Sequence, residues 1–478
     1  MLTTAVMAVC LVGCSVGPDY SGAGLVVPTH FSADNKTLVP RSDLSRWWET
    51  FHDPVLNRLV DEAVDENLNV ASAKARIREA RATRRLAVGG LFPVVTGDVA
   101  GTETKLPGKN KGAPSWLFQA GFDASWELDL FGGQRRTIEA ATYGVEAADA
   151  DLRGTLLTLI GDICTNYIAL RGTEARIALA KRTAVSQRQT VALTKSLLDA
   201  GSSSELDLAN ATALASSSEA VVPQLVQTRA EAIHRLGILL GREPGALLER
   251  LDQARPLPQP HDSLRPGLPA DLLSRRPDIA MAERQLAQAT AKIGIADAAL
   301  YPSVSLTGTI ASSANRIGSL GRGSSIGWMW GPTLTVPLLN GGVLVAAVEV
   351  ADAQRDEARL ALQSAVLTAL EDVENALVLK TQERIRAGQL AKSAGAYREV
   401  DRLSKKLWQA GSVPFLNVLD AERSLYSADD ALIQSRMLIS TDTISLAKAL
   451  GGGWDDPITV DKPLVVDGNT GPHLAVAQ

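Results

Sequence analysis

The chain repeats its own sequence, and this duplication constrains the fold more than any other feature. The segment Asn67–Pro93 aligns with Arg276–Pro302, and both segments end in an aromatic residue followed by proline. Later matches keep the two halves in register: Phe131-Gly132-Gly133 with Asn340-Gly341-Gly342, and Ala200-Gly201-Ser202 with Ala410-Gly411-Ser412. The separation between these matches far exceeds the period of a solenoid repeat. The sequence therefore predicts a tandem duplication in which each half carries the same elements in the same order.

Composition narrows the class of protein. The 478 residues carry a formal net charge of −5 that is spread along the chain, so no basic surface invites a nucleic acid. Aromatic residues make up only 4% of the chain, which favours long helices with small-residue packing over a large globular core. The three cysteines lack metal or disulfide spacing and the five histidines are isolated, so we expect no metal and no cofactor. The sequence contains no phosphate loop, dinucleotide fingerprint or recognisable catalytic triad, and we expect that it is not an enzyme.

The N-terminus has the pattern of an export signal. Residues 2–13 form a short apolar run that ends in Gly13, directly before Cys14. This pattern fits a bacterial lipoprotein cleavage site, so residues 1–13 are predicted to be a signal peptide and Cys14 the acylated first residue. Ser15 follows where an Asp would signal inner-membrane retention, which favours the outer membrane. No Lys or Arg precedes Cys14, which leaves open a translation start upstream of Met1; an ordinary buried N-terminus is the alternative.

Four segments alternate between apolar and polar residues, as strands with two different faces do. They are a weak segment near 95–99, the clear segment 116–130, and their counterparts 304–310 and 326–338. Such strands suit either a soluble sandwich or a membrane barrel. Tryptophan in the strands favours the barrel, because aromatic girdles flank its apolar band. We predict a membrane-facing set and place Asp123 on the opposite, lumen-facing side; the set is Phe118, Phe122, Trp126, Trp328 and Trp330.

The remaining sequence predicts helices that are too long for a globular domain. Residues 134–199 and 343–409 lack proline and place apolar residues at helical spacing. At 1.5 Å per residue, each helix would be roughly 100 Å long. A shorter helix follows each long one, at 205–240 and 415–450, and another precedes each strand pair, at 67–91 and 278–300. Carboxylates such as Asp151, Asp162, Glu371 and Asp372 are expected on solvated helix faces.

Four strands cannot close a barrel, and lipid tolerates no open sheet edge. Two copies would give eight strands and a filled interior, whereas three copies would give twelve strands with room for a pore. We therefore predict a mainly α-helical fold with a membrane β-barrel part, in which a homotrimer builds a twelve-stranded barrel on a tube of long antiparallel coiled-coil helices. The predicted parts are a signal peptide (1–13), an acylated segment (14–54), a first repeat (55–245), a linker (246–270), a second repeat (271–455) and a tail (456–478).

Several motifs resemble the TolC-like outer-membrane factor family, and more closely its NodT-type efflux lipoprotein branch. They are Cys14-Ser15-Val16-Gly17-Pro18-Asp19-Tyr20, Trp47-Trp48 with Asp53-Pro54, Trp126-Glu127-Leu128-Asp129-Leu130-Phe131-Gly132, Leu239-Leu240-Gly241, and Arg275-Arg276-Pro277-Asp278-Ile279 leading to Tyr301-Pro302. The resemblance covers nearly the whole chain. It implies an outer-membrane exit duct, extending into the periplasm, that passively conducts small molecules delivered by a periplasmic adaptor protein and an inner-membrane pump. A periplasmic helical scaffold without a channel, or the duct of a type I protein secretion system, are the alternatives.

Two turns between helices are the candidate entrance of the duct. The resemblance implies that these tips close the periplasmic entrance and dock the adaptor; plain helix punctuation is the alternative reading. Gly201 and Gly411 suit left-handed helix stops, Ser204 with Asp207 resembles a capping box, and Pro414 suits the first turn of the next helix. Pro414 stands where relatives often have an acidic residue, so the acidic candidates lie in the first turn. The candidate tip residues are Asp199, Gly201, Ser204, Glu205, Leu206, Asp207, Gly411, Pro414, Phe415 and Leu416.

Overall fold

The computed structural model describes residues 15–22, 24–25, 27–32, 44–105, 114–260, 264–265, 267–453 and 460. The predicted signal peptide, Cys14 and nearly all of the C-terminal tail lie outside these residues. The described chain divides into two compact units. One contains the described residues up to 25 together with 76–150 and 280–364; the other contains the remaining described residues.

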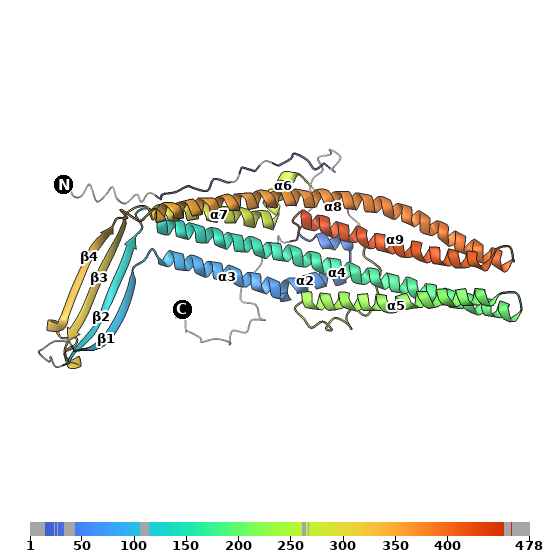
Figure 1. The fold of residues 1–478 in the computed structure, drawn as a ribbon, viewed down its shortest axis with the longest axis horizontal. Helices are drawn as coiled ribbons and strands as arrows, with labels where there is room; N and C mark the ends of the chain where they lie inside the picture. The colour runs from blue at the N-terminus through green and yellow to red at the C-terminus, as the bar shows by residue number, and fades with distance from the viewer. Residues whose placement is uncertain are drawn as a thin grey trace. The chain divides into compact units, whose positions relative to one another are not determined.

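The first unit contains one four-stranded antiparallel sheet with the strand order β1-β2-β3-β4 (Figure 1). Its strands are β1 (Val94–Thr104), β2 (Ser115–Leu128), β3 (Ser303–Ala314) and β4 (Ile326–Thr335). β1 is longer than the weak segment expected from the sequence, because it pairs with β2 along its whole length. The prediction that Val336 and Leu338 continue the last strand was wrong, since β4 ends at Thr335 and its register with β3 starts there.

The helices confirm the duplication in length as well as order. The long helices α4 (Gly133–Asp199) and α8 (Val343–Gln409) have 67 residues each. The helices that follow them, α5 (Glu205–Leu239) and α9 (Phe415–Ala449), have 35 residues each. Those that precede the strand pairs, α3 (Leu68–Gly89) and α7 (Pro277–Ala298), have 22 residues each. Equal lengths in all three pairs indicate that the two halves of the chain share the same arrangement of helices.

Two helices were not predicted as separate elements. The helix α2 (Pro54–Glu66) begins at an N-cap, Asp53, whose carboxylate accepts hydrogen bonds from two backbone N–H groups of the first turn. Asn67 separates α2 from α3, and its side-chain oxygen caps the start of α3, so the predicted helix at 67–91 begins one residue later. The short helix α6 (Pro269–Arg275) lies where the sequence predicted the end of the linker. A 3₁₀ turn, Trp47–Phe51, also precedes α2.

The core of the second unit forms where α2 packs against α4. Leu56 and Leu59 of α2 are completely buried, and so are Ile163 and Tyr167 of α4. The hydroxyl of Tyr167 donates to the Asp53 carboxylate at 2.7 Å, which joins the start of α2 to the middle of α4. Burial, and then the neighbouring Asp53 carboxylate, raise the pKa of Tyr167, so it remains a donor throughout the physiological range.

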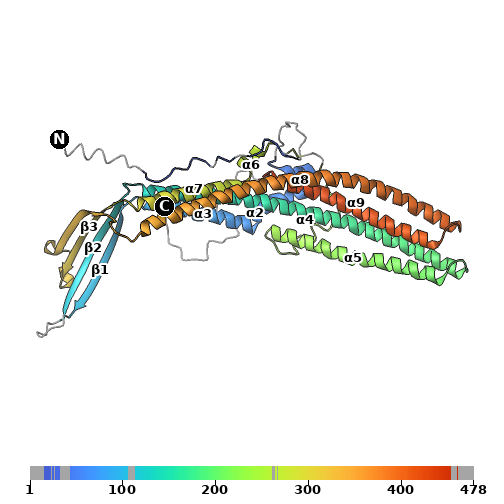
Figure 2. The same ribbon diagram turned by 45° about the horizontal axis from the view of Figure 1, so that its top comes forward.

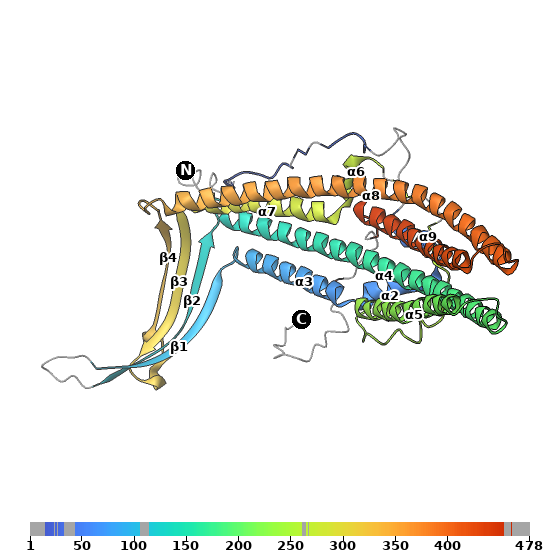
Figure 3. The same cartoon turned by 45° about the vertical axis from the view of Figure 1, so that its right-hand side comes forward.

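Further along the same unit, α4 with α5 and α8 with α9 form two helical hairpins that lie side by side in Figure 2 and Figure 3. Both long helices lack an apolar stretch sufficient to cross a bilayer, as do the other described helices. Cys164 of α4 is fully buried in the second unit, and burial raises the pKa of its thiol. The thiol therefore stays protonated and unreactive.

Candidate functional site

The sheet places all five residues of the predicted membrane-facing set on one face. Directly opposed residues in an antiparallel pair share a face, and the register aligns Phe122 with Ile310 and Ile310 with Trp328. Phe122, Trp328 and Trp330 are 62%, 73% and 68% exposed. Phe118 and Trp126 lie on the same face and are half-buried. This face is therefore a broad, exposed apolar surface.

Glycines lie opposite several of these aromatic rings. Gly97 pairs with Phe122, and a Cβ at Gly97 would lie 3.2 Å from the ring. Gly308 pairs with Trp330 across the β3–β4 ladder. An aromatic ring that covers a cross-strand glycine shields its backbone. The pattern explains why a strand as rich in glycine as β1 still pairs along its whole length.

The opposite face of the sheet is polar. Thr96, Asp123 and Thr309 are neighbours in register, and the Thr309 hydroxyl donates to the Asp123 carboxylate at 2.5 Å. Asp98 and Glu127 lie on the same face by strand alternation. The strands contribute no Lys or Arg to this face. Within the sheet, β1 and β4 each pair on one side only, so both edges present backbone groups for a further strand.

Both predicted helix stops have the same geometry. Gly201 and Gly411 adopt φ values of +74° and +69°, and a Cβ at either position would meet nothing within 4 Å. The amides of Ser202 and Ser412 donate to carbonyls five residues back, at 2.8 and 2.9 Å. These are Schellman turns, which satisfy the last carbonyls of each long helix.

The helices that start after these turns are capped differently. Ser204 and Asp207 form the predicted capping box, with the Asp207 amide donating to the Ser204 hydroxyl at 3.1 Å. Hydrogen bonds from Ser204 lower the pKa of Asp207, and this carboxylate acts as a hydrogen-bond acceptor in the cap. Pro414 is the N-cap of α9 and makes no side-chain cap bond, so the prediction that it lies in the first turn was wrong by one position. Asp199 and Glu205 are exposed.

The three apolar residues predicted at the tips separate into two groups. Leu206 and Leu416 are 69% and 58% exposed. Phe415 is buried instead, with its ring centroid 4.8 Å from that of Trp408, in a cluster with Ala211, Val418 and Leu419. Phe415, one of the candidate tip residues, therefore packs one hairpin against the other.

A buried polar network, which the sequence analysis missed, adds to this hairpin contact. Glu422 of α9 is buried and accepts from the Thr190 hydroxyl of α4 at 3.0 Å. The Lys405 ammonium of α8 lies 2.9 Å from Glu422 and 3.0 Å from Asp401. Burial opposes the charge on Lys405, but the two carboxylates outweigh this effect and raise its pKa. Three helices are thereby joined near the tips.

Arg276 anchors a second network, at the start of α7. Its guanidinium donates to Asp278 at 2.7 Å, to Asp372 of α8 at 2.9 Å and to the carbonyl of Ala449 at 3.1 Å. Asp372 lies on an exposed helix face, as predicted, and pairs there with Arg276; the half-buried Asp162 also has an ion pair, 3.7 Å from Lys448. Burial disfavours the Arg276 charge, but the two carboxylates raise its pKa.

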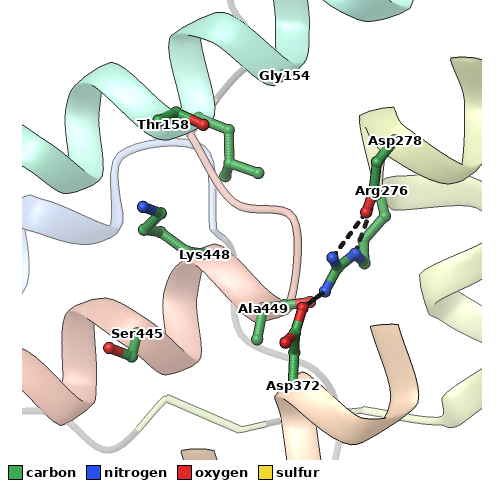
Figure 4. A pocket seen from close by; sticks show the side chains of 9 residues that line it. Gly154, Thr158, Arg276, Asp278, Asp372, Ser445, Lys448 and Ala449 are labelled. Carbon is green, nitrogen blue, oxygen red and sulfur yellow. Dashed lines mark hydrogen bonds and ion pairs between the residues drawn. The ribbon is translucent and has the colours of Figure 1, made fainter. Parts of the chain in front are cut away.

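A cavity of about 410 Å³ lies beside this network, as Figure 4 shows. Its lining includes Thr158, Ser445 and Lys448, and carboxylates already neutralise the Arg276 guanidinium. The arrangement joins α7 to α8 and α9. In the described part of the chain, no cluster of three His, Cys, Asp or Glu side chains could hold a metal ion.

Comparison with known proteins gives consistent matches over most of the chain. The family model described as outer membrane efflux protein matches residues 59–242 and 268–452, one stretch in each half. A nodulation protein T of Rhizobium leguminosarum bv. trifolii is 33% identical, over 95% of this chain and 97% of that protein. The solvent efflux pump outer membrane protein SrpC of Pseudomonas putida is 30% identical, over 92% and 96%. The solved structure of the outer-membrane channel OprN is 36% identical with a TM-score of 0.86, over 92% of this chain and 100% of that chain.

Proposed function

The chain belongs to the outer membrane efflux protein family and is an outer-membrane exit duct of a tripartite efflux system, and we propose that three copies build its channel. Its function is transport, and we propose no catalytic activity for it. Each copy would contribute four strands to a twelve-stranded barrel and one pair of helical hairpins to a periplasmic tube. The remaining partners would be a periplasmic adaptor protein, an inner-membrane pump and outer-membrane lipid.

The observation that supports this proposal is a two-faced sheet with both edges available. An isolated sheet of this kind would leave backbone N–H and C=O groups of β1 and β4 unpaired in lipid, at a cost of several kcal/mol for each group. Pairing β4 of one copy with β1 of the next removes every edge. The exposed aromatic face then meets lipid, and the polar face lines the lumen.

The polar face makes a specific prediction about ions. Asp98, Asp123 and Glu127 lie on it in the absence of strand Lys or Arg, so the lumen should attract cations. Purified protein in a planar bilayer should give channels that prefer potassium over chloride. Asp98→Asn with Asp123→Asn should reduce that preference while leaving single-channel conductance of the same order. Absence of any conductance from correctly assembled trimers would favour a helical scaffold instead.

The N-terminus is proposed to be a lipid anchor. Cleavage after Gly13 would leave Cys14 acylated, and Ser15 after it would direct the protein to the outer membrane. A fatty-acid analogue should label the wild-type chain and leave Cys14→Ala unlabelled. Equal labelling of both chains would rule out Cys14 as the site.

The tips are proposed to be both the entrance and the docking surface for the adaptor. The exposed Leu206 and Leu416 are suited to contact an apolar partner surface, and Asp199 and Glu205 to carry negative charge at the entrance. Leu206→Ser with Leu416→Ser should abolish adaptor crosslinking and efflux while trimers still form. Val185 is also exposed, but it lies on α4 away from the turns. Val185→Ser is therefore the control, and it should retain adaptor crosslinking and efflux. Unchanged adaptor crosslinking in the double variant would restrict these turns to a structural role.

A further inference from the structure

The end of the sheet that lies away from the helices carries exposed cations. The helices α3, α4, α7 and α8 all join the strands at the opposite end, as Figure 1 shows. Lys105 follows the last residue of β1, and Arg316 lies two residues beyond the last residue of β3. Both side chains are exposed, and within the described residues neither makes an ion pair. We call these two residues, together with Trp116 of β2, the outer rim.

Two tryptophans of β2 indicate how much of the sheet lipid covers. Trp116 and Trp126 lie on the same face, ten residues apart, at opposite ends of the strand. Near the helices, the Trp126 indole donates to the carbonyl of Leu91 at 2.9 Å. Ten residues extend about 33 Å along a strand, which at a barrel tilt of about 40° gives a height of about 25 Å. The apolar band of an outer-membrane barrel is about 25 Å tall and is flanked by aromatic residues, so Trp116 lies at the level of the outer headgroups.

Strand alternation places the three rim residues side by side. Trp116 pairs with Glu103, and Lys105 follows Glu103 by two residues, so Lys105 continues the apolar face of the sheet. Ala314 of β3 lies on that face as well, opposite β2, and Arg316 follows it by two residues. Neighbouring strands are about 4.8 Å apart, so the ends of β1 and β3 flank the indole about 10 Å from each other.

Local contacts hold the rim in place. The Trp116 ring stacks on Phe118, with centroids 5.4 Å apart and an angle of 8° between the planes. In the connection from β3 to β4, the Gly321 amide donates to the Ser312 hydroxyl at 2.9 Å, and the hydroxyls of Ser312 and Ser325 are 2.8 Å apart. These hydrogen bonds fold the connection that carries Arg316 back onto the end of β3.

The charges and the ring suit a phosphorylated sugar. Ammonium and guanidinium groups bind phosphate through charge-assisted hydrogen bonds. An indole presents a flat apolar surface, which suits the C–H face of a sugar ring. Glu103 carries the opposite charge next to Lys105, but Arg322 in the β3–β4 connection is exposed and adds another cation. Cations therefore outnumber carboxylates in the described part of this end of the sheet.

We propose that the outer rim binds the phosphorylated sugar headgroup of a glycolipid in the outer leaflet, with Lys105 and Arg316 on phosphate and Trp116 against the sugar. The inference rests on the proposed trimeric barrel, which sets the rim at the level of the lipid headgroups. The acyl chains would then lie along the exposed apolar face, which continues from Trp116 to Phe122. Phosphatidylglycerol offers a phosphate without a sugar ring, so the same site should prefer the glycolipid.

Native mass spectrometry of purified trimers tests the proposal. The probes are bisphosphorylated lipid A, which carries its phosphates on a disaccharide, the dephosphorylated form of lipid A, and phosphatidylglycerol. Wild-type trimers should bind bisphosphorylated lipid A about ten-fold or more tightly than either of the other lipids. Lys105→Gln with Arg316→Gln should lose the preference for the phosphorylated form. Trp116→Leu should lose the preference over phosphatidylglycerol.

A second pair of cations gives a matched control. Lys181 and Arg182 are adjacent, exposed residues of α4. Lys181→Gln with Arg182→Gln removes the same types and number of charges as the rim variant, and it should bind lipid A as wild type does. Equal loss of lipid A binding from the rim variant and from this control would attribute the binding to net charge and overturn the proposal. Displacement of lipid A by an equimolar amount of inorganic phosphate would show a site for the ion alone and overturn it as well.

Conductance separates this inference from the proposed function. Trimers that conduct in a planar bilayer and bind the three lipids equally overturn the glycolipid site and leave the channel intact. Trimers that never conduct, or chains that do not form trimers, overturn the proposed channel and with it the level assigned to the rim. Conducting wild-type trimers, with a preference for bisphosphorylated lipid A that only the rim variants lose, support the inference.

Discussion

Adjacent residues in the middle of β2 should respond in opposite ways to the same charge. Phe122 is the eighth of the fourteen residues of β2 and lies on the exposed aromatic face, while Asp123 lies on the polar face. An arginine facing lipid at the bilayer midplane costs about 2–4 kcal/mol. Phe122→Arg should impose this cost once per copy, which amounts to about 6–12 kcal/mol for a trimer. Asp123→Arg loses the hydrogen bond from Thr309, worth about 1 kcal/mol in an exposed position, and places no charge in lipid.

The assay is assembly in the outer membrane. Cells expressing each variant from the same promoter are fractionated, and heat-modifiable trimers are quantified by gel mobility with and without boiling. Phe122→Arg should deplete trimers strongly, Asp123→Arg should retain most of them, and Phe122→Leu should behave as wild type. Equal depletion by the two arginine variants would refute the assignment of faces. Greater depletion by Asp123→Arg would reverse it.

Three further predictions concern the helices. Burial lowers the pKa of Lys380 to about 8, below its unfolded value, so its charge costs stability at neutral pH and that cost disappears as the pH rises from about 8 towards 10.5. Lys380→Met should therefore raise the free energy of unfolding at pH 7 by about 1–3 kcal/mol and flatten its pH dependence over that range. Urea titrations of both proteins at pH 7 and 9.5 test this. An equal difference in unfolding free energy at the two pH values would contradict it. Glu422→Gln should weaken the contact between the hairpins by about 1–2 kcal/mol and raise the resting conductance. Glu205→Gln, which is exposed at the first turn, is the control and should leave the contact unchanged. Identical resting currents from wild type and Glu422→Gln would exclude a role for the network. Gly411→Val should abolish efflux complementation while Gly411→Asn, which tolerates positive φ, should preserve it, and loss of trimers in the valine variant would point to a folding defect instead.

Local signals account for the parts that the sequence predicted well. Glycine and proline mark the ends of the long helices, and no proline interrupts residues 134–199 or 343–409. The alternation of apolar and polar residues predicted the two faces of the sheet, because successive side chains of a strand point to opposite faces. The boundary between α2 and α3 was missed because Asn67, a single capping residue, produces no gap in the helical pattern. Local signals therefore predict that a segment is helical better than they predict where one helix ends and the next begins.

Long-range pairing accounts for what the sequence could not predict. Arg136 meets Gly17 from 119 residues away, and Arg276 meets Asp372 from 96 residues away. Nothing in the neighbourhood of Arg136 distinguishes it from the arginines that face solvent, and the motif around Arg276 does not reveal that Asp372 is its partner. The burial of Phe415 likewise depends on distant residues, since it packs against Trp408 and a second hairpin. Such contacts require the fold before their chemistry can be seen.

The geometry of the tips restricts where an opening motion could occur. Both Schellman turns have satisfied their terminal carbonyls, and the capping box commits Asp207, so a bend at the first turn would break several hydrogen bonds at once. The contact between the hairpins is different in kind, because the cluster around Phe415 and the bonds to Glu422 hold separate elements together. Sliding or parting two intact hairpins exchanges these contacts without unwinding a helix, and packed helices commonly move by such small shifts. We therefore expect the two hairpins to move as rigid pieces, with the glycine turns acting as stops and the Glu422 network setting the cost of separation.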